Sequence, residues 1–204
     1  MNKSPFWEEA YRDKDANVFG KPSREFCDLI RMLPNQASVL DLGCGEGRNA
    51  LFLAQQGYRV TALDISQAAI EKLKYLANKE GLTIDLAIAD IRHFNLENSY
   101  DLIVAHGSLH LIQRKDWQTL IPALKAVTKR GGYNVVAVFT NRIAPPEDLK
   151  DFCIGLFEEG ELFELYADWV EFFKDSYVIE EEHPGSPRHR HSLNKIVAQK
   201  PITK

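Results

Sequence analysis

The chain has few cysteines and no long apolar run, and both absences exclude classes of protein. Three cysteines occur among 204 residues, and no two of them have the C-x-x-C spacing of structural zinc sites. No stretch of about 18 apolar residues occurs, and the first residues, MNKSPFWE, lack the apolar segment of a signal peptide. We therefore expect a cytoplasmic protein without disulfides, structural zinc or a membrane-spanning helix.

A strong charge imbalance is also missing. The formal net charge is −4 and the pI is near 5.9, which does not favour binding to nucleic acid or to an anionic membrane. Hydrophobic residues make up 45% of the chain and charged residues 26%, as in ordinary globular proteins. This length suits one domain with a sizeable core, so we expect a single domain over residues 1–204.

The most informative stretch is a glycine-rich turn. Residues 37–42 form an apolar run that predicts a buried parallel strand, and an amphipathic helix is predicted after the turn. Between them stands the pattern D-x-G-x-G-x-G, formed by Asp41, Gly43, Gly45 and Gly47. In a dinucleotide-binding turn of the G-x-G-x-x-G type, the third glycine would stand where this chain has Arg48. The Asp41 carboxylate would repel a pyrophosphate and suits a cationic amino-acid group.

Strand and helix patterns alternate from the glycine turn onward. Apolar runs predict further strands at residues 58–64, 84–89, 100–105 and 133–139. Such alternation is typical of an α/β fold with a parallel sheet. A helix is predicted over residues 116–130, with a kink or a restart near Thr119 because Pro122 lies inside it.

The last third of the chain departs from this alternation. Residues 141–160 predict a loop with a short helix, and we expect them to cover the active site. Residues 169–199 predict two antiparallel strands that flank a turn containing Pro184 and Pro187. Together with the five earlier strands, this pair predicts a seven-stranded sheet that is mostly parallel.

Acidic and polar residues follow the predicted strands, at the edge where open α/β sheets bind ligands. Asp64 lies 19 positions after Gly45, close to the spacing of about 20 at which Rossmann-like folds place a carboxylate that binds ribose hydroxyls. Ile65 follows and is placed to pack on an adenine ring. The loop after the fourth strand, residues 106–111, should lie beside the same ligand.

These features resemble the class I S-adenosylmethionine-dependent methyltransferases over about residues 35–140. The resemblance implies a Rossmann-like α/β fold, a seven-stranded, mostly parallel sheet with an antiparallel C-terminal strand, and helices on both faces. It implies S-adenosyl-L-methionine as cofactor, with Asp90 accepting a hydrogen bond from the adenine amino group. The cofactor-binding residues that it implies are Asp41, Gly43, Gly45, Gly47, Arg48, Asn49, Asp64, Ile65, Asp90, Ile91, Ala105 and His106.

The resemblance also implies a division of the chain. Residues 35–140 would form the cofactor-binding core, residues 141–168 a substrate lid, and residues 169–204 the C-terminal strand pair. Residues 1–34 would form a helical lid in which Trp7, Tyr11 and Phe19 close over the cofactor. The alternative is that these aromatic residues only pack on the domain, as aromatic residues at helical spacing usually do.

Two further stretches are similar to one family of these enzymes. Gly47-Arg48-Asn49 with Leu53-Ala54 and Gly57-Tyr58 resembles the G-R-N-x-x-x-L-A-x-x-G-Y pattern of the tellurite-resistance methyltransferases called TehB, and residues 157–169 resemble their C-terminal half. That family carries a His-Arg pair before its last strand that is thought to serve an oxyanion substrate. His183 matches the histidine, but Pro184 replaces the arginine.

The predicted substrate side rests on His110, His183 and Arg188. His183 and Arg188 belong to a basic cluster with His189, Arg190 and His191, and in a strand the two histidines 189 and 191 share one face. An anionic substrate would suit one face of this cluster, and a charged, solvated edge strand is the alternative. A His-x-His metal site is a further alternative, but no third ligand is evident, so we predict no metal.

The predicted function is methyl transfer from S-adenosyl-L-methionine to a small molecule, such as tellurite, selenite or another soft anion. An unrelated metabolite methylated with His106 or His110 as general base is the alternative. A regulatory protein that binds the cofactor without turnover is the second alternative, and its sign would be a blocked substrate pocket. No [DNS]-P-P-[YF] motif follows the fourth strand and no Pro-Cys dipeptide occurs, which disfavours nucleic-acid methyltransferases.

Overall fold

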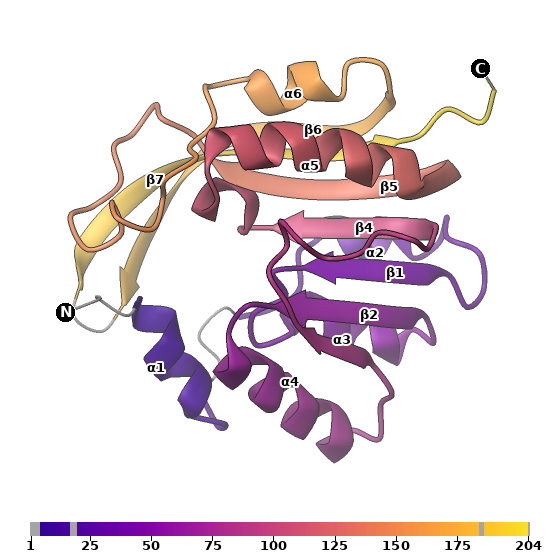
Figure 1. Cartoon of the computed structure of the whole chain (residues 1–204), viewed down its shortest axis with the longest axis horizontal. Coiled ribbons are helices and arrows are strands. Elements are labelled where there is room, and N and C mark those ends of the chain that lie inside the picture. Colours follow the sequence, from indigo (N-terminus) through magenta and orange to yellow (C-terminus); the bar gives the residue numbers. More distant parts are fainter. Residues whose placement is uncertain (1–4, 17–19, 184–185, 204) are drawn as a thin grey trace.

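The computed structural model describes residues 5–16, 20–183 and 186–203, apart from the side chains of residues 183, 186 and 187. Within these residues seven strands form one sheet in the order β3-β2-β1-β4-β5-β7-β6 (Figure 1). The strands are β1 Ser38–Leu42, β2 Arg59–Asp64, β3 Asp85–Ile88, β4 Tyr100–His106, β5 Thr128–Phe139, β6 Val170–His183 and β7 Ser186–Gln199. All seven predicted strands are present, and β5 begins earlier than expected.

The sheet is mixed, and its first five strands run parallel. Strand β1 lies between β2 and β4, with Val39 opposite Val60 on one side and Leu102 on the other. Strand β7 is antiparallel to both β5 and β6. The predicted mostly parallel sheet with an antiparallel C-terminal strand is therefore confirmed. The parallel strands end at one edge, which brings Asp41, Asp64 and His106 together.

The C-terminal hairpin reaches beyond the rest of the sheet. Strand β7 pairs with β5 from Leu193 to Gln199, whereas its residues before Leu193 pair with β6 alone. Figure 1 shows this outer part of the hairpin curving past the end of β5 on the side of the molecule where α1 lies. The hairpin thus adds two strands to the sheet and also extends past the edge at which the parallel strands end.

Helices cover both faces of the sheet. They are α1 Phe6–Arg12, α2 Glu25–Leu29, α3 Arg48–Gln55, α4 Gln67–Lys79, α5 Arg114–Val127 and α6 Glu161–Leu165, with a 3₁₀ turn η1 at Leu109–Leu111. Alternate strand residues point to opposite faces, so Leu40 of β1 packs in the cluster with α5 and α6, and Val39 packs in the cluster with α2, α3 and α4. Among the described residues, no helix has the length and apolar character needed to cross a bilayer.

Two local predictions differ from the structure. Of the predicted kink or restart near Thr119, the restart does not occur, because helix α5 is continuous through Pro122. Both Pro122 and Gln118 are exposed, so the Gln118 carbonyl that loses its helical partner can be hydrated. Residues 141–160 contain turns but no helix, and the short helix α6 follows Gly160 instead.

The glycine turn between β1 and α3 needs residues without a Cβ atom. Gly43 has φ +68°, and a Cβ there would lie 2.4 Å from the Ser108 Cβ. Gly47 has φ +89°, and a Cβ there would lie 2.2 Å from a methyl group of the buried Leu73. The turn therefore approaches the loop after β4 on one side and α4 on the other more closely than any other residue type permits.

We predict that Gly43→Ala destabilises the protein more than Gly81→Ala. Gly81 has φ +67° and nothing within 4 Å of an added Cβ, so it carries the same backbone cost without the collision. Both variants should lose about 1 kcal/mol for the left-handed conformation, and Gly43→Ala should lose roughly 1–3 kcal/mol more. Urea unfolding curves measure both, and equal losses would contradict the close approach to Ser108.

Candidate functional site

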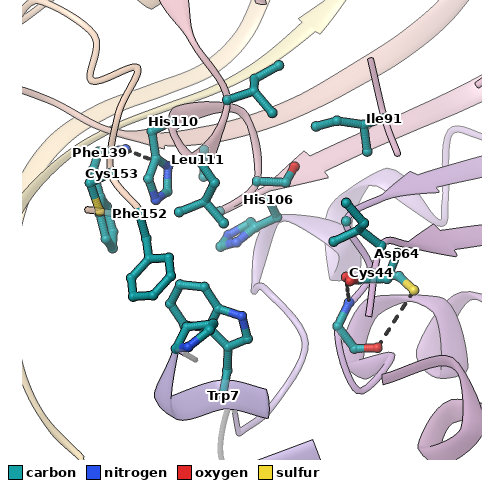
Figure 2. Close-up of a pocket in the computed structure, with 18 of the residues that line it drawn as sticks. Trp7, Cys44, Asp64, Ile91, His106, His110, Leu111, Phe139, Phe152 and Cys153 are labelled. Carbon is teal, nitrogen blue, oxygen red and sulfur yellow. Dashed lines mark hydrogen bonds between the residues drawn. The ribbon is translucent and has the colours of Figure 1, made fainter. Parts of the chain in front are cut away.

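A cavity of about 880 Å³ lies at the carboxyl ends of the parallel strands. Its walls come from the glycine turn, the ends of β2 and β4, helix α1, the segment from Leu149 to Ile154 and the inner face of the hairpin β6–β7. Figure 2 shows Asp64 and Cys44 on one side of this space, and Trp7 and Phe152 on the other, with His106 between them. The volume is sufficient for a nucleoside-sized ligand together with a second small molecule.

Asp41 is the carboxylate at the base of the cavity. It is 2% exposed, and its Oδ2 atom has no hydrogen-bond partner among the described residues. Burial, helped by the nearby charge of Asp64, raises the pKa of Asp41 to about 7, although the Arg48 guanidinium opposes the shift. A buried carboxylate with an unsatisfied oxygen is costly unless a ligand supplies a donor or a positive charge.

Asp64 and Asp90 are the other two acids of the cavity. The carboxylate of Asp64 accepts hydrogen bonds from the backbone N–H groups of Gly45 and Ser66, both at 2.9 Å. Burial raises the pKa of Asp64, and these two bonds oppose the shift. Asp90 instead accepts bidentate hydrogen bonds from Arg92, which lower the pKa of Asp90.

Two isoleucines lie beside these acids. Ile65 is 68% exposed although it lines the cavity, while Ile91 is buried. An exposed isoleucine next to Asp64 offers an apolar surface on which an aromatic ring can pack.

Arg48 and His106 form a partly buried polar pair at the middle of the cavity. The Arg48 guanidinium donates to His106 Nδ1 at 2.9 Å, so the ring proton is on Nε2, which lies 2.8 Å from the Ser23 hydroxyl. Burial and the positive charge of Arg48 hold the pKa of His106 well below its usual range. His106 is therefore neutral, with one nitrogen accepting and the other donating.

His110 is also neutral and fixed in one tautomer. Its Nδ1 accepts the backbone N–H of Phe139 at 3.2 Å, and its ring stacks on that of Phe139 with centroids 4.1 Å apart (Figure 2). Burial and the neighbouring His191 lower the pKa of His110 to about 3. A histidine with so low a pKa is a weak proton acceptor near neutral pH, and its Nε2–H is a donor.

Not every residue that the family resemblance implied lines the cavity. Ala105 is fully buried in the core cluster on the α5 face, and Gly47 packs against Leu73. Asn49 lines the cavity, but its side-chain oxygen accepts the Ser23 N–H at 3.4 Å. Gly47 and Ala105 therefore shape the turn and the strand beneath the cavity instead of lining it.

The N-terminal helix and the segment after β5 meet across the cavity. Trp7 of α1 packs edge-to-face on Phe152, with ring centroids 5.6 Å apart (Figure 2). Tyr11 is buried over the glycine turn, where its hydroxyl would lie 2.8 Å from a Cβ at Gly45. The third aromatic residue of the predicted lid, Phe19, lies outside the described residues.

The hairpin contributes residues that the sequence analysis did not single out. Tyr177, Ile179 and Glu181 of β6 and Leu193 and Lys195 of β7 line the cavity. Lys195 pairs with Glu25 of α2 at 3.2 Å, and both side chains are mostly buried. The sequence shows that alternate residues of these two strands share a face. Only the pairing of the strands shows which of the two faces lines the cavity.

Of the two predicted substrate residues of the hairpin, Arg188 is not brought to the cavity. Arg188 is exposed and pairs with Glu180 at 2.9 Å, so it faces away from the lining residues. The backbone of His183 pairs with Ser186 at the end of the hairpin, and the His183 side chain lies outside the described parts of the structure. The cations that line the cavity are Arg48, Arg92 and Lys195.

The charge state of Asp41 gives a stability test. The pKa of Asp41 is about 7 in the folded chain, above the usual value near 3.9. The free energy of unfolding therefore falls as the pH rises from about 4 to 7, because the buried carboxyl group must then ionise. We predict that Asp41→Asn raises the free energy of unfolding by roughly 2–4 kcal/mol at pH 8, with a gain that disappears near pH 4.

Asp101 is the matched control for this measurement. Partial burial favours a raised pKa, but hydrogen bonds from Lys129 and Ser38 lower the pKa of Asp101 overall. Asp101→Asn should therefore lower stability at pH 8, with a loss that shrinks as the pH falls below about 4. Urea unfolding at several pH values distinguishes the two variants, and a stability loss for Asp41→Asn at pH 8 would contradict the assignment.

Comparisons with known proteins identify relatives of this chain. A family model described as tellurite resistance protein TehB matches residues 8–185. The probable S-adenosyl-L-methionine-dependent methyltransferase TehB of Haemophilus influenzae is 37% identical over 147 residues, which are 71% of this chain and 50% of that protein. The crystal structure of TehB from Haemophilus influenzae matches with a TM-score of 0.79 at 30% identity, covering 95% of this chain and 67% of that chain.

A relative with a different name is also similar. The 2-heptyl-1-hydroxyquinolin-4(1H)-one methyltransferase of Mycobacteroides abscessus is 32% identical over 133 residues, which are 63% of this chain and 57% of that enzyme. The chain spans about half the length of the curated TehB proteins that it matches. The match over most of the chain shows that it belongs to the TehB family of class I methyltransferases, whose cofactor is S-adenosyl-L-methionine.

Proposed function

We propose that this chain transfers a methyl group from S-adenosyl-L-methionine to a small anionic acceptor, with chalcogen oxyanions such as tellurite and selenite as the leading candidates. The observation that carries the proposal is the distribution of charge in one cavity. Asp41 and Asp64 lie at the glycine turn, and Arg48 and Lys195 line the side toward the hairpin. A cationic cofactor and an anionic acceptor would each meet side chains of opposite charge.

The acids of the cavity suit the cofactor's polar groups. The unsatisfied Oδ2 of Asp41 would accept from the ammonium group of the methionine part, and Asp64 would accept from the two ribose hydroxyls. Both oxygens of Asp90 accept from Arg92, so Asp90 would accept from the adenine amino group after Arg92 gives up one of these bonds. Ile65 and Ile91 would pack on the adenine ring. Gly43 and Gly45 line the cavity, so their backbone would lie beside this ligand.

The acceptor side suits a nucleophile that is already anionic. When bound, the cofactor supplies an electrophilic methyl group on a sulfonium, and the protein aligns the acceptor, which is worth roughly 7–11 kcal/mol. Arg48 and Lys195 would attract and orient the anion, and the Nε2–H of His110 would donate a hydrogen bond to it. A soft anion needs no general base.

The alternative with a histidine base has weaker support. Arg48 donates to His106 Nδ1, and the His106 Nε2–H is directed to Ser23, so neither nitrogen is available to take a proton. The pKa of His110, near 3, makes that ring a poor base as well. The regulatory alternative also loses support, because a cavity of about 880 Å³ is not a blocked pocket.

We further propose that α1 and the segment from Leu149 to Ile154 close over the bound ligands. The contact between Trp7 and Phe152 already joins these two segments on the cavity wall. Lys72 holds the end of α1 in place, since its ammonium group donates to the carbonyl oxygens of Ala10 and Ala16 and pairs with Glu46 of the glycine turn at 2.7 Å. Such a closure would exclude water from the reacting groups.

Product formation with a panel of acceptors tests the proposal. The protein is incubated with S-adenosyl-L-methionine and tellurite, selenite, small thiols, or hydroxylated acids, and S-adenosylhomocysteine is measured by mass spectrometry. We expect acceptor-dependent product with the anionic chalcogen compounds. Turnover only with the hydroxylated acids, whose nucleophile is a neutral hydroxyl group, would overturn the assignment of an anionic nucleophile, and no turnover on any acceptor would overturn the enzymatic one.

Lys195→Gln should raise the KM for the anionic acceptor roughly 10-fold while leaving cofactor affinity unchanged, because one charge-assisted contact is lost. Lys174→Gln is the matched control, since Lys174 is an exposed residue of β6 that does not line the cavity. Equal KM values for the two variants would remove Lys195 from the acceptor site.

A further inference from the structure

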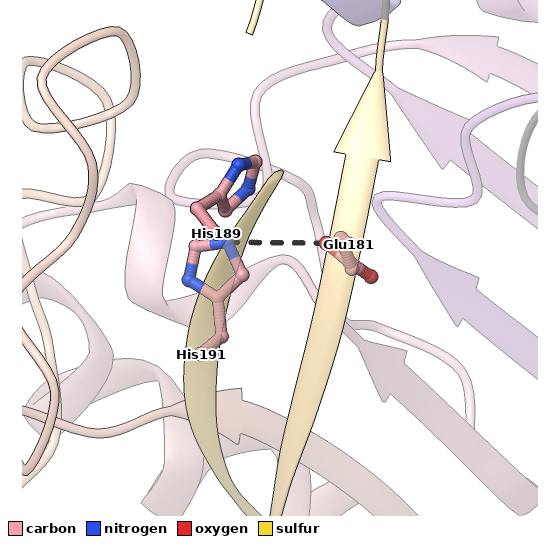
Figure 3. Close-up of side chains that lie close together, drawn as sticks. All are labelled: Glu181, His189 and His191. Atoms are coloured by element: carbon pink, nitrogen blue, oxygen red, sulfur yellow. Dashed lines mark ion pairs between the residues drawn. The ribbon is translucent and has the colours of Figure 1, made fainter. Parts of the chain in front are cut away.

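We infer that the hairpin carries a binding site for one divalent transition-metal ion, formed by Glu181, His189 and His191. Glu181 of β6 lies directly opposite His189 of β7, and His191 follows two positions later on the same face of β7. Figure 3 shows the three side chains gathered on one side of the hairpin, with the carboxylate of Glu181 directed to the histidines. The sequence alone could not supply this third ligand, because Glu181 reaches the histidines only across the turn.

The spacing of the donor atoms fits a metal ion. One ligand atom from each of the three residues lies within 4.8 Å of the others, and His191 Nε2 lies 3.8 Å from a carboxylate oxygen of Glu181. Two ligands at about 2.1 Å from a tetrahedral ion are about 3.4 Å apart. The largest separation between the donors, up to 4.8 Å, must shorten by about 1.4 Å for all three to reach one ion, and side-chain rotations can supply a change of this size.

The surroundings orient one ligand before any ion binds. His191 is 2% exposed, and its ring stacks on Phe139 with centroids 4.1 Å apart and an interplanar angle of 10°. The His189 ring is nearly perpendicular to the His191 ring, at an interplanar angle of 84°. The two imidazoles would therefore approach one ion from different directions. The stacking on Phe139 therefore holds the His191 ring in place at the proposed site.

The donor set selects the class of ion. Two imidazoles and one carboxylate suit Zn²⁺ and also Fe²⁺, whereas Mg²⁺ and Ca²⁺ prefer sites made of oxygen ligands. Glu181 lines the cavity, so a bound ion would add positive charge to the wall near Arg48. Attraction of an anionic acceptor by that ion rests on the proposed function, but binding of the ion itself does not.

Zinc titration of the full chain without cofactor tests the inference. Calorimetry with ZnCl₂, followed by dialysis and metal analysis, should give one zinc ion per chain. Glu181→Gln and His189→Ala should each weaken zinc binding at least ~10-fold, because each removes one ligand. Glu180→Gln is the matched control, since Glu180 neighbours Glu181 on β6 but faces away and pairs with Arg188. His93→Ala controls for an exposed histidine elsewhere.

Two outcomes would overturn the inference: no stoichiometric zinc on the unaltered chain, or equal zinc affinity in Glu181→Gln and Glu180→Gln. Calorimetric binding of S-adenosyl-L-methionine to each variant shows that it is folded, because Glu181 and His189 are not among the proposed cofactor residues. Metal binding and methyl transfer are measured separately, so failure of this site leaves the proposed function standing, and failure of turnover leaves the metal site standing.

Discussion

The close packing of backbone at the glycine turn is the constraint on which the rest of the site depends. Ser108 of the loop after β4, Tyr11 of α1 and Leu73 of α4 each occupy the space where a side chain at Gly43, Gly45 or Gly47 would lie. Three elements from distant parts of the sequence therefore converge on one turn. This convergence leaves Asp41 buried beneath the turn and opens the cavity directly above it.

A chain of polar interactions through Arg48 then connects the two sides of the cavity. The charge of Arg48 acts on Asp41 at the glycine turn and on Tyr177 and Glu181 of the hairpin, and its guanidinium donates to His106. Because both ring nitrogens of His106 are engaged, the histidine fixes the position of Arg48 instead of exchanging protons. Charge at the centre of the cavity is thus held by packing and hydrogen bonds that form before any ligand binds.

Sequence patterns predicted the sheet well because the period of each strand and the glycine turn are local features. The ligand edge followed from the parallel strands, and Asp41, Asp64 and Asp90 all line the cavity. The sequence could not show which basic residue of the hairpin lines the cavity, since Arg188 and Lys195 both belong to one strand. Only the pairing of β6 with β7 and β5 shows that Lys195 faces the cavity and Arg188 the solvent.

The interaction between Asp41 and a cationic amino group is the central claim, and one comparison tests it directly. Calorimetric titration at pH 8 measures the affinity of the protein for S-adenosylhomocysteine and for its analogue without the α-amino group. We predict that the complete ligand binds with one site per chain and at least ~10-fold more tightly than the analogue, because a charge-assisted contact to a buried carboxylate is lost. Equal affinities for the two ligands would contradict the account.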